Sequence, residues 1–140
     1  MLIFSIYLIF CVFIAVLDIK YRVIPNRITF LGQGVGFLLN LSILGILGLL
    51  DGILGAIVGV FCLMFSGFLN LTLYKRPSLG GGDVQLMGLI GAFWGWKVAV
   101  ITYALAPFLC VLWAIKTLQT RVAYGAIIIV ASFIALLITK

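Results

Sequence analysis

Long apolar runs separated by short polar, glycine or proline links make up most of this chain. They lie at about 2–17, 28–44, 52–73, 84–96, 98–115 and 122–139. Runs of this length and hydrophobicity are typical of helices that cross a lipid bilayer, where every backbone polar group must be bonded internally. The pattern therefore predicts an all-α membrane protein, a polytopic bundle of about six transmembrane helices in a single domain over residues 1–140.

Two parts of this pattern are less regular. The apolar stretch 45–50 is either a glycine-spaced link or an extension of the second helix. The fourth run, 84–96, would span only about 20 Å, less than the roughly 30 Å of bilayer hydrocarbon. Either neighbouring loops extend this helix, or its entrance at Gly80–Asp83 lies below the lipid headgroups. Irregular backbone at that depth needs protein cover or a water-filled cavity, and a hydrolase would require a wet recess around Asp83. Glycines also recur at four-residue spacing, which indicates close helix packing: Gly32 and Gly36, Gly55 and Gly59, Gly91 and Gly95.

The composition agrees with a membrane protein and excludes several kinds of chemistry. Of 140 residues, 66% are hydrophobic and 9% charged, too few to give a soluble domain its polar surface. The chain has no histidine, which removes Ser-His and Cys-His catalysis and most metal sites. Cys11, Cys62 and Cys110 lie inside apolar runs without a Cys-x-x-Cys pair, so we interpret them as small packing residues. We expect no cofactor and no metal.

The net charge of +6 is better interpreted as a signal of membrane topology than as a sign of nucleic-acid binding. With six crossings, the links near 18–27, 75–83 and 116–121 share one side of the membrane. They carry seven of the nine basic residues: Lys20, Arg22, Arg27, Lys75, Arg76, Lys116 and Arg121. The opposite side keeps Lys97, Lys140 and the acid Asp51. Positive residues mark the cytoplasmic side, so we predict that both termini face outward and that Asp18 and Asp83 lie at the cytoplasmic edge.

These two carboxylates are the candidate chemistry. Asp18 ends the first apolar run, and Asp83 follows the glycine triplet Gly80, Gly81 and Gly82. An ionisable residue at a membrane segment is costly, and two that meet can carry out acid/base hydrolysis of a peptide bond. We expect Asp18, at the negative end of its helix, to hold the shared proton, and Asp83, at a helix start, to be the base.

Each carboxylate also has a structural interpretation. Asp83 is a candidate N-cap, and Asp18 is a candidate ion-pair partner of Arg22, one turn further on. The residues around the pair favour a site. The glycine triplet leaves room for a substrate backbone and permits positive φ angles, Pro25 turns the chain between helices one and two, and Asn26 is a candidate cap there.

Together these residues resemble the paired signature of type IV prepilin peptidases. The motifs are Asp18 with Ile24-Pro25-Asn26, followed by Gly80-Gly81-Gly82-Asp83-Val84; Arg121-Val-Ala-Tyr-Gly125 is similar to the start of the family's last helix. The resemblance implies a membrane aspartyl protease of the Gly-x-Gly-Asp type, in which Asp18 and Asp83 activate water. Two departures are Gln85, where the family very often has lysine, and the absence of the proline common near Tyr124.

The resemblance also implies the substrate and the setting. Such enzymes remove the short basic leader from prepilin or pseudopilin proteins at the cytoplasmic face of the bacterial inner membrane. This chain is similar to the short, peptidase-only members that serve Flp (tight-adherence) pili, without a separate methyltransferase domain. The implied partners are a prepilin substrate and the lipid bilayer, with no nucleic acid. Two other functions stay open at this point: a small proton-coupled membrane transporter, and a catalytically silent membrane subunit of a secretion or pilus machine.

Overall fold

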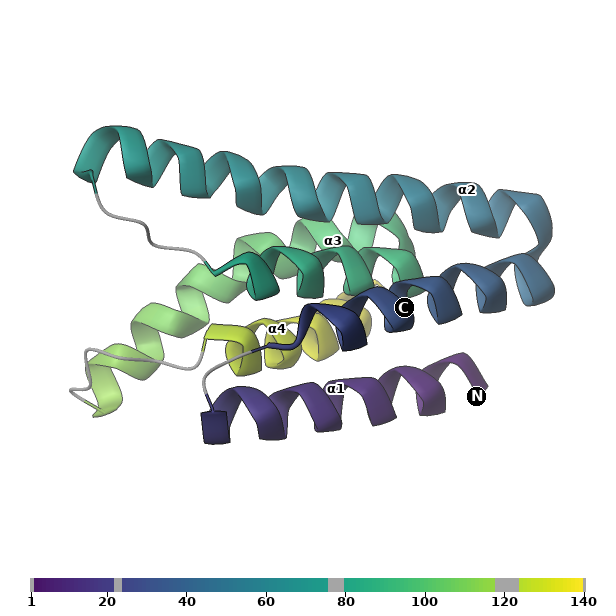
Figure 1. Ribbon diagram of the computed structural model, residues 1–140, viewed down its shortest axis with the longest axis horizontal. Helices are drawn as coiled ribbons and strands as arrows, with labels where there is room; N and C mark the ends of the chain where they lie inside the picture. The colour runs from purple at the N-terminus through teal and green to yellow at the C-terminus, as the bar shows by residue number, and fades with distance from the viewer. Residues whose placement is uncertain (1, 22–23, 76–79, 118–123, 140) are drawn as a thin grey trace.

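The computed structural model describes residues 2–21, 24–75, 80–117 and 124–139, and they are almost entirely helical. The helices are α1 (Leu2–Tyr21), α2 (Asn26–Tyr74), α3 (Gly81–Thr117) and α4 (Tyr124–Ile138), arranged as a bundle (Figure 1). Helices α1, α2 and α3 are long and apolar enough to cross a membrane, and α4 is a shorter apolar helix. The predicted all-α fold is confirmed, and the length and composition of three of its helices suit a membrane protein.

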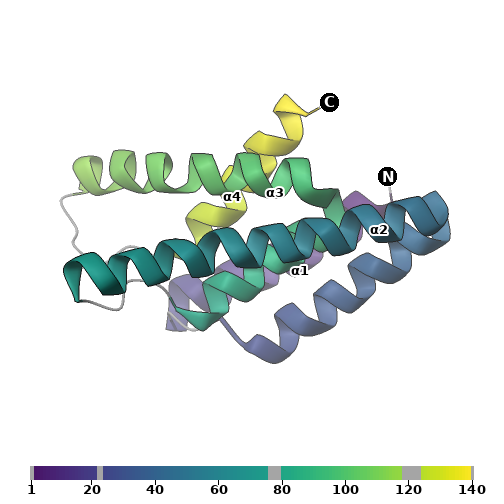
Figure 2. The ribbon, with the colours of Figure 1, turned by 90° about the horizontal axis from the view of Figure 1, so that it is seen from above.

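Two glycines break the long helices. Gly45 in α2 has φ 70° and ψ −157°, and Gly95 in α3 has φ 78° and ψ −178°. A side chain is strained at such positive φ values, whereas glycine adopts them readily. The chain turns back at both positions, so α2 and α3 are each a pair of helices (Figures 1 and 2). The sequence had suggested that the stretch 45–50 is either a link or an extension of the preceding helix. Instead, the break lies at Gly45 and residues 46–50 begin the second helix of α2.

The first helix of α3, which carries Asp83, lies at the centre of the bundle. Residues 86–93 of this helix are all buried. Glycines of both α2 helices contact it: a Cβ atom added at Gly36 would lie 2.8 Å from the Phe93 ring, and one at Gly59 would lie 2.8 Å from the Met87 carbonyl oxygen. The predicted packing role of the paired glycines is confirmed. Because protein surrounds this helix, it does not need the full length of a lipid-facing span.

Helices α1 and α4 complete the core on the other side of α3. The hydroxyl groups of Tyr7 in α1 and Ser132 in α4 form a buried hydrogen bond of 2.6 Å. The Tyr7 ring also packs against Phe93, Trp94 and Phe133. Cys11 is buried and Cys62 and Cys110 are half-buried, and all three are free thiols, as predicted. Large apolar side chains cover the outside of the bundle, for example Leu47 at 76% exposure, which is the surface expected of a lipid-facing protein.

Candidate active site

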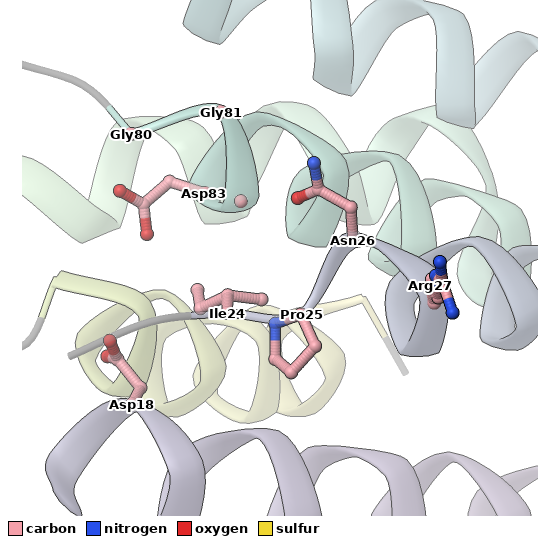
Figure 3. A pocket seen from close by; sticks show the side chains of 9 residues that line it. Asp18, Ile24, Pro25, Asn26, Arg27, Gly80, Gly81 and Asp83 are labelled. Atoms are coloured by element: carbon pink, nitrogen blue, oxygen red, sulfur yellow. The ribbon is translucent and has the colours of Figure 1, made fainter. Parts of the chain in front are cut away.

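One pocket, of about 680 Å³, gathers the residues that the sequence indicated. It lies between the end of α1, the link into α2 and the start of α3 (Figure 3). Its lining residues are Asp18, Ile24, Pro25, Asn26, Arg27, Gly80, Gly81, Gly82 and Asp83. All seven residues predicted for the site are therefore in the same pocket, although more than fifty positions separate Asn26 from Gly80 in the sequence.

Asp18 has a buried carboxyl group. It lies in the last turn of α1 and is only 6% exposed. Its Oδ2 atom accepts a hydrogen bond of 2.9 Å from the backbone N–H of Ala126, in the first turn of α4. The first N–H groups of a helix have no partner within the helix and carry its positive dipole end, so they suit a carboxylate oxygen.

Asp83 is the third residue of α3 and is half-buried. It is inside the first turn, and its backbone N–H donates a 3.1 Å hydrogen bond to the Gly80 carbonyl oxygen. Its carboxyl group projects into the pocket on the side opposite Asp18 (Figure 3). Among the described residues, no hydrogen bond joins the two carboxyl groups, and both line the same pocket.

The residues around the pair differ in part from their predicted roles. Gly82 packs against the link, because a Cβ atom there would lie 2.7 Å from the Cβ atom of Ile24, whereas Gly80 and Gly81 are exposed. None of the triplet uses a positive φ angle; the glycines that do, within the described residues, are Gly45 and Gly95.

The turn between α1 and α2 is built as expected in one respect and not in another. Pro25 has φ −70° and ψ 115°, an extended backbone that turns the chain into α2, as predicted. Asn26 is the first residue of α2, and no side chain caps this helix, so a helix cap at Asn26 is wrong, whereas a role in capping the turn stays a prediction. Arg22, the suggested ion-pair partner of Asp18, lies outside the described residues.

The start of α4 is the part of the site that sequence reasoning missed. A Cβ atom at Gly125 would lie 2.6 Å from Cδ1 of Ile24 and 2.9 Å from Oδ2 of Asp18. The absence of a side chain at Gly125 therefore lets α4 approach Asp18. The sequence-based assignment of the proton to Asp18 considered only the dipole of its own helix. That assignment stays a prediction. The available signal was the Tyr124-Gly125 motif, but nothing in it indicated a contact with Asp18.

Metal ligands do not gather anywhere in the described part of the chain. Within those ranges there is no group of three or more histidine, cysteine, aspartate or glutamate side chains that could hold a metal ion.

Comparison with known proteins gives a consistent result. The sequence model of the type IV leader peptidase family matches residues 5–115. Curated relatives named prepilin leader peptidase/N-methyltransferase include one from Pseudomonas putida, 27% identical over 131 residues, which covers 89% of this chain and 45% of the relative. Another, from Pectobacterium carotovorum subsp. carotovorum, is 32% identical over 88 residues, which covers 63% of this chain and 31% of the relative. The chain thus spans less than half the length of these relatives. No solved structure matches it significantly.

Proposed function

The chain belongs to the type IV leader peptidase family, and from this membership we propose that it is an aspartic endopeptidase that removes the leader from prepilin-like proteins. The observation that carries the proposal is the shared pocket of Asp18 and Asp83. A pocket with two carboxyl groups and exposed glycine backbone has the parts that peptide hydrolysis needs. The relatives' names join two activities, a leader peptidase and an N-methyltransferase, and the proposal concerns only the peptidase.

The two carboxyl groups would divide the acid/base work. In the resting pair, one carboxyl group keeps a proton and the other is ionised, because two close carboxylates do not both ionise freely. The ionised group takes a proton from a water molecule as the water oxygen attacks the scissile carbonyl carbon. The protonated group stabilises the oxygen of the tetrahedral intermediate, and a proton passes to the leaving amine as the C–N bond breaks. The products are a leader carboxylate and a new N-terminal amine.

The pocket also suits the chemistry of a leader peptide. The exposed backbone at Gly80 and Gly81 leaves space for an extended peptide beside Asp83. Large exposed apolar side chains lie on α1 nearby, including Ile19 and Val16. We infer that the hydrophobic helix of the substrate stays in the bilayer against such a surface, while the short basic leader enters the pocket from water.

For the membrane topology, we propose six crossings of the bacterial inner membrane, one for each helix of the broken pairs together with α1 and α4. Support comes from the direction reversals at Gly45 and Gly95 and from Lys20, Arg27 and Lys75, which lie near the helix ends at the pocket side. By the positive-inside rule this end is cytoplasmic, and both termini are outside. The aspartyl protease is then of the Gly-x-Gly-Asp type, with its site at the cytoplasmic edge.

Cleavage by the purified protein tests this function. The protein in liposomes is incubated with prepilin-like substrates, beside Asp18→Asn and Asp83→Asn variants. Asp51→Asn is the matched control, because Asp51 is the remaining acid of the chain and does not line the pocket. We expect a shortened product from the unmodified protein and from Asp51→Asn, and none from the other two. Cleavage that survives either pocket substitution in a folded protein would refute the pair. No cleavage of any prepilin-like substrate would favour a transporter or a silent subunit.

A further inference from the structure

Behind the pocket, a second polar cluster joins α2 to the first turns of α3. Its members are Thr29 and Gln33 of α2 and Gln85 of α3. The Thr29 hydroxyl and Gln85 Oε1 are 2.9 Å apart, and Gln33 Nε2 donates a 2.9 Å hydrogen bond to the backbone carbonyl of Gln85. Thr29 is fully buried, at 0% exposure. Buried polar side chains between membrane helices are costly unless they are bonded, so this cluster is a specific link and not a casual contact.

We propose that this cluster is a positioning device for Asp83: it holds the first turn of α3 at a fixed rotation and height relative to the Asn26 end of α2. Gln85 and Thr29 are then positioning residues, since neither lines the pocket. The effect of the cluster on catalysis rests on the proposed peptidase function, but its effect on the position of the first turn of α3 does not.

The geometry of a helix explains why the cluster would act on Asp83. Successive residues project about 100° apart around an α-helix, so Asp83 and Gln85 point to nearly opposite sides of the same turn. A bond at Gln85 on the α2 side therefore sets the rotation of that turn and, with it, the direction of the Asp83 carboxyl group. The bond from Gln33 to the Gln85 carbonyl oxygen fixes the same residue along the helix axis.

The surroundings of Asp83 make such a link necessary. The residues before it are Gly80, Gly81 and Gly82, which carry no side chains that could anchor the turn. In the described residues, the hydrogen bonds from α2 to the first two turns of α3 are those that Gln85 receives. A glycine-rich turn is easily deformed, so an anchor just beyond it restricts the carboxyl group.

The other end of the link reaches the opposite wall of the pocket. The Thr29 hydroxyl also lies 2.9 Å from the backbone carbonyl of Asn26, a pocket residue. The hydroxyl has one hydrogen for two acceptors. If the amide of Gln85 is turned by 180°, its NH₂ group donates to Thr29 and Thr29 donates to Asn26. With the amide turned in this way, the Thr29 hydroxyl bonds both to Gln85 and to the Asn26 turn, so one buried group links the two walls of the pocket.

Two substitutions at Thr29 separate this role from simple packing. Thr29→Val keeps the shape and removes the hydroxyl, whereas Thr29→Ser keeps the hydroxyl. For the purified protein with a prepilin-like substrate, we expect Thr29→Val to lower kcat by roughly ten- to a hundred-fold, with KM within about two-fold, because misplacement of a reacting group acts on the chemical step. Thr29→Ser should keep most of the activity. Equal kcat values for the two folded variants, or a loss confined to KM, would overturn the proposal.

Gln85→Met and the double variant Thr29→Val/Gln85→Met add a second criterion. Because both residues act through one bond, we expect the double variant to lose about as much kcat as Thr29→Val alone. Losses that multiply would show two independent effects and would contradict the shared link.

A distance measurement tests the positioning claim without any need for activity. Phe30 and Gly81 are exposed, and each can carry a spin label on an introduced cysteine after the native cysteines are replaced by alanine. We expect one narrow distance distribution in the parent protein and in Thr29→Ser, and a broadened or shifted one in Thr29→Val. Identical distributions would overturn the positioning role even if the protein is an active peptidase. An inactive protein that shows the expected broadening would contradict the proposed function alone.

Discussion

The backbone N–H of Ala126 donates a 2.9 Å hydrogen bond to Oδ2 of Asp18, across 108 positions of sequence. This bond connects the last turn of α1 with the first turn of α4, so α4 holds a side chain that lines the pocket. It engages one of the two carboxyl oxygens of Asp18, Oδ2. The sequence motifs did not connect this helix with Asp18.

Gly125→Ala should disturb this arrangement. The added Cβ atom would lie 2.6 Å from Cδ1 of Ile24 and 2.9 Å from Oδ2 of Asp18, closer than van der Waals contact allows. We expect displacement of the Asp18 carboxyl group and a loss of cleavage rate of roughly ten-fold or more. The control is Gly34→Ala, since a Cβ atom at that helical glycine meets nothing within 4 Å. Full activity of folded Gly125→Ala would show that the approach of α4 is not required.

Gly91→Ala should weaken the centre of the bundle. The added Cβ atom would lie 2.1 Å from the carbonyl oxygen of Gly55, and backbone atoms cannot move aside as a flexible side chain can. The α2 and α3 backbones must therefore separate, and we expect a loss of about 1–3 kcal/mol in the free energy of unfolding in detergent. Gly34→Ala again serves as the control. A Gly91→Ala variant as stable as this control would contradict the close approach of the two helices.

Asn40→Leu should destabilise the break in α3. The Asn40 side chain is buried, and its Nδ2 atom donates to the carbonyl oxygens of Ala92 and Phe93 at 2.8 and 3.2 Å. These carbonyl groups lie just before Gly95, where the first helix of α3 ends and leaves them without helical partners. We expect a loss of about 1–2 kcal/mol in unfolding free energy.

Ser42→Ala is the matched control for Asn40→Leu. The exposed Ser42 hydroxyl donates to the Leu38 carbonyl oxygen within its own helix. Removal of that bond should change stability by less than about 0.5 kcal/mol. If both variants lost the same stability, the Asn40 bonds would not be what supports the helix end.

Tyr7→Phe and Ser132→Ala should have unequal effects, although they remove the same hydrogen bond. Ser132 donates its one hydroxyl hydrogen to the Ile129 carbonyl oxygen at 2.7 Å, so the Tyr7 hydroxyl donates to Ser132. Ser132→Ala leaves a buried donor on Tyr7 without that acceptor, which costs about 1–3 kcal/mol, whereas Tyr7→Phe leaves Ser132 bonded to Ile129.

The free energies of unfolding of the two variants and of the double variant measure this asymmetry. We expect Tyr7→Phe to restore part of the stability that Ser132→Ala loses, because it removes the donor that has lost its Ser132 acceptor. A Tyr7→Phe variant less stable than Ser132→Ala would reverse the assigned direction of the bond.

Much of this protein follows from the sequence by itself. The apolar runs determine the helices, because in a bilayer the backbone can be satisfied in few other ways. The scarcity of carboxylates determined the candidate site: Asp18, Asp83 and the residues beside them can be found without a structure, and they share one pocket. The four-residue glycine spacing likewise indicated close packing, because the pattern of small residues is local and repeats with the helix.

Other features were decided only by the tertiary structure. The reversal at Gly45 was not visible, since glycine is compatible with both a continuous helix and a break, and packing against α3 decides between them. The bond of Ala126 to Asp18 and the link of Thr29 to Gln85 join residues 108 and 56 positions apart. A backbone N–H leaves no mark in the sequence, and a threonine or glutamine in an apolar run does not show which helix it faces. Hydrophobic patterning determines which segments form helices, but it is shape and hydrogen-bond complementarity between helices that decides which ends meet.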